Sequence, residues 1–171
     1  MKVRIAGIVN ESVSDGPGLR IAVFFQGCKH HCPGCHNPQT WNFEGGEEVE
    51  FPELMSRIAD TPLIRGVTLT GGDPFYQPQP ALEIAREFHL RGKEVWAYTG
   101  YVWDELFDIQ DPVVQNLVRE CDVIVDGPFI QSQAVPGLKY RGSSNQRLIL
   151  VRETLKTRVI TEWISPFTKI S

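Results

Sequence analysis

Three of the four cysteines in the chain lie within one short stretch, FFQGCKHHCPGCHNPQTW, which runs from residue 24 to residue 41. They are Cys28, Cys32 and Cys35, with the spacing Cys-x3-Cys-x2-Cys, and Pro33-Gly34 tightens the second interval. A loop this compact aims three thiolates at one point, and thiolates bind zinc and iron. Structural zinc sites and electron-transfer iron–sulfur clusters normally use four protein ligands. Three thiolates on a four-iron cubane therefore leave one iron atom open, as in a reaction site.

Other interpretations of this loop stay open. His30, His31 and His36 flank the cysteines, so a zinc site with three cysteines and one histidine also fits the spacing. A disulfide within the triplet would leave one thiol unpaired and is disfavoured where thiols stay reduced. Cys121 lies far away, at the start of a later predicted strand. We expect it to be a small core residue rather than a distant fourth ligand.

The elements that must position the loop alternate between apolar strands and amphipathic helices. Strands are predicted at residues 19–27, 66–72, 93–101, 121–129 and 146–151, and helices at residues 51–59, 80–90 and 113–120. Strands that alternate with helices predict a parallel sheet with crossover helices. The strands lack clean period-two alternation, as expected when both faces of a sheet are covered.

Each of the first four predicted strands runs into a polar or glycine-rich segment. These segments are Gly27-Cys28, Gly71-Gly72-Asp73-Pro74, Thr99-Gly100-Tyr101 and Asp126-Gly127-Pro128. Ligands bind at the carboxyl ends of strands in barrels and in open parallel sheets. We therefore expect these segments, which are scattered in sequence, to meet at one face of the fold.

Length and composition limit the remaining possibilities. The 171 residues predict a single domain, and a net charge of −4 without a basic run argues against nucleic-acid binding. No stretch approaches the roughly 18 apolar residues of a membrane span, and the start of the chain does not match a signal peptide. We therefore expect a cytoplasmic protein that does not bind membranes.

Several motifs beyond the cysteines resemble one enzyme family. The segments SDGPGLR, GCHNPQTW, LTGGDPF, YTGY, VDGPF and RGSSNQR follow one another between residues 14 and 147. With the cysteine triplet they resemble the radical S-adenosylmethionine (SAM) superfamily and, within it, the activating enzymes of anaerobic ribonucleotide reductase. The resemblance implies an α/β fold, a partial, open parallel β/α barrel of the radical SAM type. It covers a core of about residues 5–151 and leaves residues 152–171 as a tail, either a strand, a helix or a docking surface.

The resemblance also implies the cofactors and the residues that bind them. Cys28, Cys32 and Cys35 would hold one 4Fe-4S cluster, whose fourth iron is chelated by the amino and carboxylate groups of SAM. Further SAM contacts are expected at Gly34, Cys35, His36, Gly71, Gly72, Asp73, Pro74, Thr99, Asp126, Ser143 and Asn145. Asp126 is equally compatible with capping the turn after its strand. No side chain is assigned as a general acid or base, and Trp41 and Phe43 are expected to pack rather than to recognise a ligand.

The implied reaction is the reductive cleavage of SAM to a 5′-deoxyadenosyl radical, which removes a hydrogen atom from a glycine of the reductase subunit. A low-potential electron donor such as flavodoxin or ferredoxin is then a second partner. Three alternatives remain: an activating enzyme of another glycyl radical enzyme, such as pyruvate formate-lyase; a small-molecule enzyme of the deazaguanine-forming kind; and a zinc-stabilised binding module without catalysis. The first usually has longer chains, and the second departs from this cysteine spacing.

Overall fold

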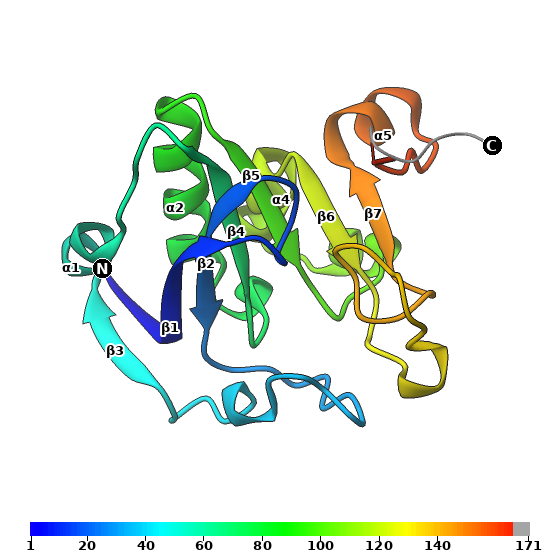
Figure 1. Cartoon of the computed structure of the whole chain (residues 1–171), viewed down its shortest axis with the longest axis horizontal. Coiled ribbons are helices and arrows are strands. Elements are labelled where there is room, and N and C mark those ends of the chain that lie inside the picture. The colour runs from blue at the N-terminus through cyan, green and yellow to red at the C-terminus, as the bar shows by residue number, and fades with distance from the viewer. Residues whose placement is uncertain (166–171) are drawn as a thin grey trace.

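A computed structural model describes residues 1–165 of the chain and contains one seven-stranded sheet with the order β3-β1-β2-β4-β5-β6-β7 (Figure 1). The strands are β1 (Lys2–Ser12), β2 (Leu19–Phe25), β3 (Glu47–Glu50), β4 (Ile64–Gly71), β5 (Glu94–Tyr98), β6 (Val123–Asp126) and β7 (Arg147–Leu150). The α-helices are α1 (Phe51–Arg57), α2 (Pro78–Leu90), α3 (Trp103–Asp108), α4 (Pro112–Glu120) and α5 (Val151–Thr157). Among the described residues, every helix is too short or too polar to cross a membrane.

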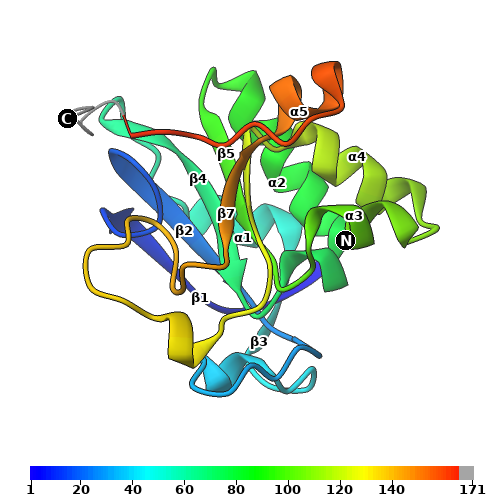
Figure 2. The same cartoon turned by 90° about the vertical axis from the view of Figure 1, so that its right-hand side faces the viewer.

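Four neighbouring strands, β2, β4, β5 and β6, run parallel to one another. The connections between them contain α1, α2 and the pair α3 and α4. Helices α2 and α4 lie on one side of the sheet, and the loop of residues 127–146 projects on the other (Figure 2). The predicted open α/β sheet with crossover helices is therefore confirmed.

Two features differ from the parallel sheet that the sequence predicts. Strand β7, the fifth predicted strand, lies antiparallel to β6, with Ile124 opposite Ile149. It can do so because a loop rather than a crossover helix leads into it. At the other edge, β1 pairs antiparallel with both β2 and β3. Neither β1 nor β3 is predicted, since register shifts interrupt the alternation of β1 and β3 is very short.

Alternate residues of the strands face two separate apolar clusters. The larger cluster lies between the sheet and the helices, and Val95 and Ile124 contribute to it. Cys121 is only 2% exposed and belongs to this cluster, which confirms that it is a core residue. The smaller cluster contains Trp96 and Val125, whose side chains leave the opposite face of the same strands.

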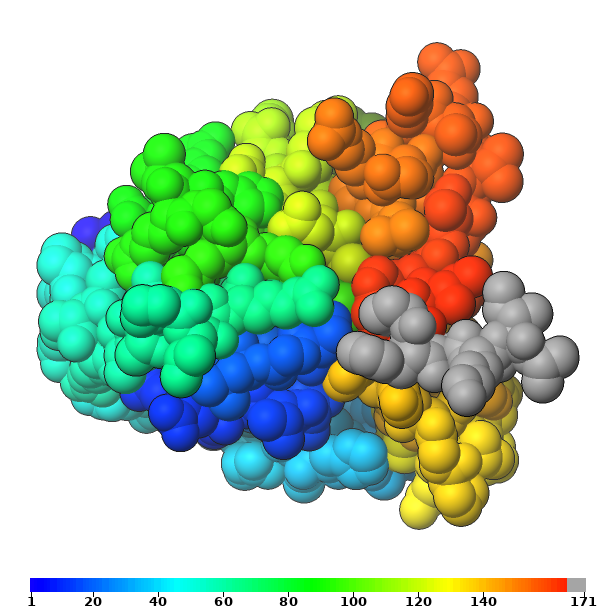
Figure 3. All heavy atoms as spheres, turned by 45° about the horizontal axis from the view of Figure 1, so that its top comes forward, coloured from blue at the N-terminus to red at the C-terminus, as the bar shows by residue number. Residues whose placement is uncertain are grey.

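The tail contains both a helix and a strand-like segment. After α5 the chain returns along β7, where the amide of Leu150 donates to the carbonyl of Thr161 at 2.8 Å and Glu162 forms a bridge with Ile149. Trp163 then packs on the smaller cluster, with its ring 5.4 Å from Trp96. In Figure 3 the red segment that carries it lies next to the orange residues of β7 and α5. Residues 166–171 of the predicted tail lie outside the described part of the chain.

Candidate functional site

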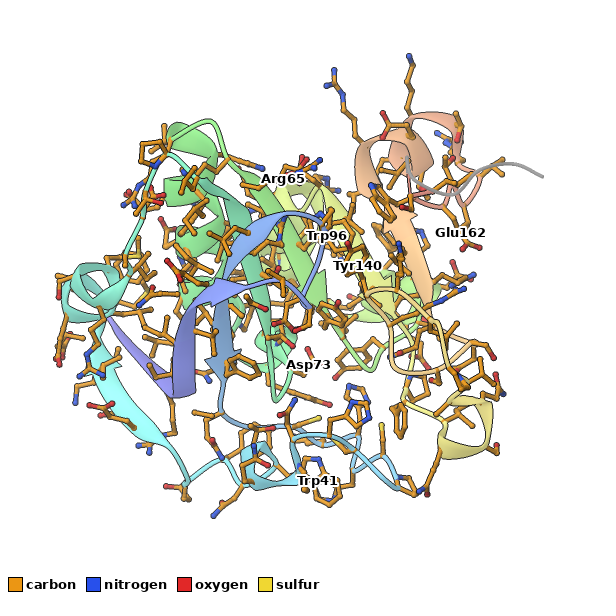
Figure 4. All side chains as sticks on the ribbon, viewed as in Figure 1. Trp41, Arg65, Asp73, Trp96, Tyr140 and Glu162 are labelled. Carbon is orange, nitrogen blue, oxygen red and sulfur yellow. The ribbon has the colours of Figure 1, made fainter. Side chains whose placement is uncertain are left out.

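The cysteine loop and the segments that follow the parallel strands meet at the carboxyl edge of the sheet. In Figure 4, Asp73 lies at this edge, between the strands and the loop that carries Trp41. A pocket opens here, and seven of the predicted site residues line it: Cys28, Cys32, Cys35, His36, Gly71, Gly72 and Thr99. The prediction that the scattered strand ends share one face is therefore confirmed.

Backbone hydrogen bonds hold the cysteine loop in a compact shape. Gly27 turns the chain off β2 with a φ of 104°, and its amide donates to the carbonyl of Thr40 at 2.8 Å. The amide of Cys28 donates to the carbonyl of Trp41 at 3.1 Å. The two ends of the loop thus lie side by side, and the three cysteines lie in the segment between them.

The three thiols of the loop are free, and each has at least one backbone amide near its sulfur. Burial raises the pKa of Cys28 and the backbone amides of His30 and His31 partly offset this, which leaves the pKa at about 11. Burial also raises the pKa of Cys32, and the backbone amide of Phe129 opposes this. The amide of Asn37 donates to Cys35 Sγ at 3.4 Å. Amide donors stabilise sulfur that carries negative charge, so these amides favour a bound thiolate and oppose the effect of burial.

The three cysteines are spread around one shared space, as the ligands of a cluster are. Within residues 1–165, no three Cys, His, Asp or Glu side chains converge closely enough to bind one metal ion. In a cubane each cysteine binds a different iron atom, so its ligands need only surround a shared space. Cys28, Cys32 and Cys35 surround the pocket in this way.

A glycine pair forms the wall of the pocket where β4 ends. Gly71 has a φ of 95°, and a Cβ on it would lie 2.7 Å from the backbone nitrogen of Phe25. A Cβ on Gly72 would lie 2.4 Å from the carbonyl oxygen of Gly27. The amide of Gly72 also donates to the carbonyl of Phe25 at 2.8 Å. Only glycine allows the β4 loop to cross so close to the end of β2.

Asp73 and Pro74 lie behind this wall rather than in it. The Asp73 side chain is fully buried, and its carboxylate accepts hydrogen bonds from Phe75 N at 2.9 Å and Thr99 Oγ1 at 2.8 Å. Pro74 begins the 3-10 turn Pro74–Tyr76, which Asp73 caps. Asp73 thus organises the loops around the pocket.

Asp126 and Ser143 also support the pocket from outside. The Asp126 carboxylate accepts from Trp103 N at 2.8 Å and from Arg147 Nη2 at 2.5 Å, so it caps α3 and pairs with β7. Ser143 Oγ accepts from the amide of Ile130 at 3.1 Å, which fixes the loop of residues 127–146. None of these groups lines the pocket.

Gly34 and Asn145 likewise lie outside the pocket lining. A Cβ on Gly34 would lie 2.8 Å from the side chain of Gln131, so the glycine lets the two loops touch. Asn145 Nδ2 donates to the carbonyl of Pro128 at 2.8 Å, and its Oδ1 atom is buried without a hydrogen-bond partner.

Other pocket residues are not predicted from the sequence. Asp15, Thr70, Tyr98, Phe129, Gly142 and Gln146 line it as well. Each falls inside one of the motifs that carry the family resemblance. Membership of such a motif was the feature of the sequence that could have identified them as pocket residues. Trp41 was expected only to pack. It stacks on His31, with ring centroids 4.8 Å apart, and it also lines the pocket.

The chain is similar to known proteins over the segment that carries this pocket. A model of the 4Fe-4S single cluster domain family matches residues 14–149. The chain is 40% identical over 143 residues to the anaerobic ribonucleoside-triphosphate reductase-activating protein of Vibrio cholerae, covering 78% of this chain and 89% of that protein. The protein of the same name from Escherichia coli K12 is 38% identical over 143 residues, covering 78% and 90%.

Similarity extends to a phage protein and to a solved structure. The protein of the same name from Enterobacteria phage T4 is 36% identical over 142 residues, covering 78% of this chain and 85% of that protein. The crystal structure of QueE from Escherichia coli aligns with a TM-score of 0.44 at 19% identity, over 58% of this chain and 53% of that one. On the family model and the sequence relatives, the chain belongs to the 4Fe-4S single-cluster family of anaerobic ribonucleoside-triphosphate reductase-activating proteins.

Proposed function

We propose that this protein is a radical SAM enzyme that activates an anaerobic ribonucleoside-triphosphate reductase. The observation that carries the proposal is a pocket lined by three free thiols from one loop, in a chain of the reductase-activating family. Three thiolates leave one iron atom of a 4Fe-4S cluster for SAM. When bound, the cluster and SAM supply the 5′-deoxyadenosyl radical that removes a hydrogen atom from a glycine of the reductase.

In this proposal the residues of the chain bind the cluster and SAM, orient them and shield them from solvent. Cys28, Cys32 and Cys35 hold the cluster, and the backbone of Gly71 and Gly72 offers a side-chain-free wall for the methionine part of SAM. The His36 ring lies 5.0 Å from that of Phe129, and the two give an aromatic surface suited to adenine.

The other predicted contacts have supporting roles in this proposal. Thr99 lines the pocket, while Gly34, Asp73, Pro74, Asp126, Ser143 and Asn145 fix the loops that form it. No general acid or base is required, because the step moves an electron and a hydrogen atom. We propose that residues 1–171 form one domain.

The partners follow from the reaction. A folded reductase subunit presents its glycine segment at the pocket, and a low-potential donor such as flavodoxin or ferredoxin supplies the electron. We propose the cytoplasm as the compartment, since free thiols and a reduced cluster require reducing conditions.

The test is anaerobic reconstitution with iron and sulfide, followed by addition of reductant, SAM and the reductase. We expect about four irons per chain, 5′-deoxyadenosine, and a glycyl radical signal on the reductase. Pyruvate formate-lyase in place of the reductase serves as the matched control and should give no radical. A colourless protein with one zinc and no 5′-deoxyadenosine would refute the proposal. A radical on pyruvate formate-lyase alone would instead identify the protein as an activating enzyme of pyruvate formate-lyase.

A further inference from the structure

The Asp73 carboxylate joins three segments that are far apart in sequence. Its Oδ2 atom accepts from Thr99 Oγ1 at 2.8 Å and from the amide of Gly100 at 3.0 Å, both in the loop after β5. The same atom lies 3.0 Å from Nε2 of His30, which belongs to the cysteine loop. One buried oxygen therefore connects the loops after β2, β4 and β5.

The chemistry of the carboxylate decides the direction of the contact with His30. A carboxylate only accepts hydrogen bonds, so Nε2 of His30 must carry the hydrogen and donate it to Asp73. The backbone amide of the same residue lies at the sulfur of Cys28. His30 thus touches a predicted cluster ligand through its main chain and the neighbouring loop through its side chain.

The surroundings of the His30 ring fix it in one place. Its side chain is 16% exposed, and its ring makes an edge contact with Tyr101, with centroids 4.6 Å apart. Tyr76 lies on another side at 5.7 Å. A Cβ on Gly100 would lie 2.4 Å from the ring, so the absence of a side chain there makes room for the imidazole.

We propose that His30 is a positioning residue that anchors the cysteine loop to Asp73 and thereby holds Cys28, Cys32 and Cys35 around the pocket. The anchor lowers the rate at which the loop opens and releases its iron. Removing such a supporting contact commonly costs ten- to hundredfold in metal affinity. The inference rests on the proposed function only in taking these three cysteines as cluster ligands.

Two substitutions of His30 and one of its neighbour distinguish loss of the His30–Asp73 hydrogen bond from a general loosening of the loop. His30→Phe keeps an aromatic ring between Tyr76 and Tyr101 but removes the donor. His30→Gln places an amide donor at about the position of Nε2. His31→Asn is the control in the same loop. It removes the ring that stacks on Trp41, and asparagine tolerates the φ of 48° at this position.

The measurement is the rate of iron loss from each reconstituted protein to a ferrous chelator in the absence of oxygen. We expect His30→Phe to lose iron about tenfold faster than the unmodified protein, with His30→Gln and His31→Asn each within about threefold of it. In the cluster-free proteins, reaction of the loop thiols with a disulfide reagent should follow the same order. Circular dichroism confirms that each cluster-free variant is folded.

Three results would overturn the inference. His30→Phe retaining iron as long as the unmodified protein would show that the anchor does nothing. Faster iron loss in His30→Gln, which lacks the ring, than in His30→Phe would assign the effect to the ring instead of the hydrogen bond. A loss in His31→Asn equal to that in His30→Phe would make it a property of the whole loop. Failure of the unmodified protein to take up iron would instead refute the proposed function.

Discussion

At the scale of single residues, the four cysteines differ in their surroundings although all four thiols are free. Three lie in a loop where backbone amides approach their sulfurs, whereas Cys121 lies in the apolar core at the end of α4. Burial raises the pKa of Cys121, and the neighbouring carboxylates of Asp122 and Glu120 raise it further. The same residue type therefore has two roles in this protein. Cys121 packs in the core, and the three loop cysteines are the proposed cluster ligands.

This separation predicts the outcome of alanine substitutions. Cys28→Ala, Cys32→Ala and Cys35→Ala should each prevent the protein from holding a complete cluster, because no other cysteine lines the pocket. Cys121→Ala should keep the iron content of the unmodified protein and lower the free energy of unfolding by about 1 kcal/mol, through a small cavity. Iron analysis and urea unfolding give the two quantities. Iron loss in Cys121→Ala would contradict the assignment.

The site residues were predictable to the extent that their motifs were. The cysteine spacing and the glycine pair locate the pocket, because a group of thiolates needs closely spaced cysteines and a wall without side chains needs glycines. Both can be recognised in the sequence. The hydrogen-bond partners of Asp73, Asp126 and Ser143 cannot be recognised in this way. Each binds groups brought close by strand pairing and loop packing, so the sequence could not distinguish lining the pocket from supporting it.

At the scale of elements, the close crossing of the β4 loop over β2 depends on Gly72. Gly72→Ala should lower the free energy of unfolding by about 2 kcal/mol, because its Cβ would meet the carbonyl oxygen of Gly27 at 2.4 Å. Gly7→Ala is the matched control, since a Cβ on this strand glycine meets nothing within 4 Å. Denaturant unfolding of both variants tests the prediction. Equal stability of the two would show that the crossing tolerates a side chain.

A second element-scale prediction concerns His89, at the end of α2. Its Nδ1 and Nε2 atoms lie 2.8 Å from Glu120 and 3.0 Å from Asp122, so both nitrogens need a hydrogen. Burial lowers the pKa of His89, but the hydrogen bonds to Asp122 and Glu120 outweigh it, and the net pKa is raised. A raised folded-state pKa stabilises the protein below the ordinary histidine pKa of about 6.5. This stabilisation is lost as pH rises through the folded-state value.

The measurement compares the unmodified protein with His89→Gln across pH 5.5 to 8. The difference in free energy of unfolding should be largest at the acid end of this range and should shrink toward the alkaline end. A difference that grows with pH would mean that His89 is neutral between the two carboxylates. Arg86→Gln, on the same helix and paired only with Glu83 in the structure described, should show no such trend.

The elements themselves were largely predictable where they are long or buried on both faces. The predicted helix at residues 80–90 appears as Pro78–Leu90, and Gly92 follows it with a φ of 70°. The edges were not predictable in the same way. Strand β1 has partly exposed positions throughout, so the apolar pattern that identifies the central strands is weak there. The direction of β7 depends on its connection and not on its own residues.

At the scale of the whole molecule, the tail completes the smaller apolar cluster. The ring of Trp163 contacts those of Trp96 and Tyr140, at 5.4 and 5.7 Å, and the segment that carries it pairs with β7. Trp163→Ala should lower the free energy of unfolding by about 2 kcal/mol, less than for a fully buried tryptophan. Ile164→Ala, at a side chain that is 72% exposed, should change it by less than about 0.5 kcal/mol.

Thermal or denaturant unfolding of these two variants tests whether the tail is part of the fold. If Trp163→Ala is as stable as Ile164→Ala, the tail does not contribute to the stability of the sheet. The sequence left this question open, because aromatic residues at the end of a chain suit either a docking surface or a contact with the chain itself. One ring partner of Trp163, Trp96, lies more than sixty positions earlier, on β5.

The position of the thiol loop early in the chain has a consequence during synthesis. The ribosome makes Cys28, Cys32 and Cys35 before it makes Asp73, Gly100 or Phe129, which surround or secure them. A growing polypeptide therefore displays the sulfurs that we propose as cluster ligands while the groups that restrain them do not yet exist. We therefore expect the cofactor to be assembled only after these later residues have been made, and incomplete chains to be more exposed to oxidants and to the wrong metal.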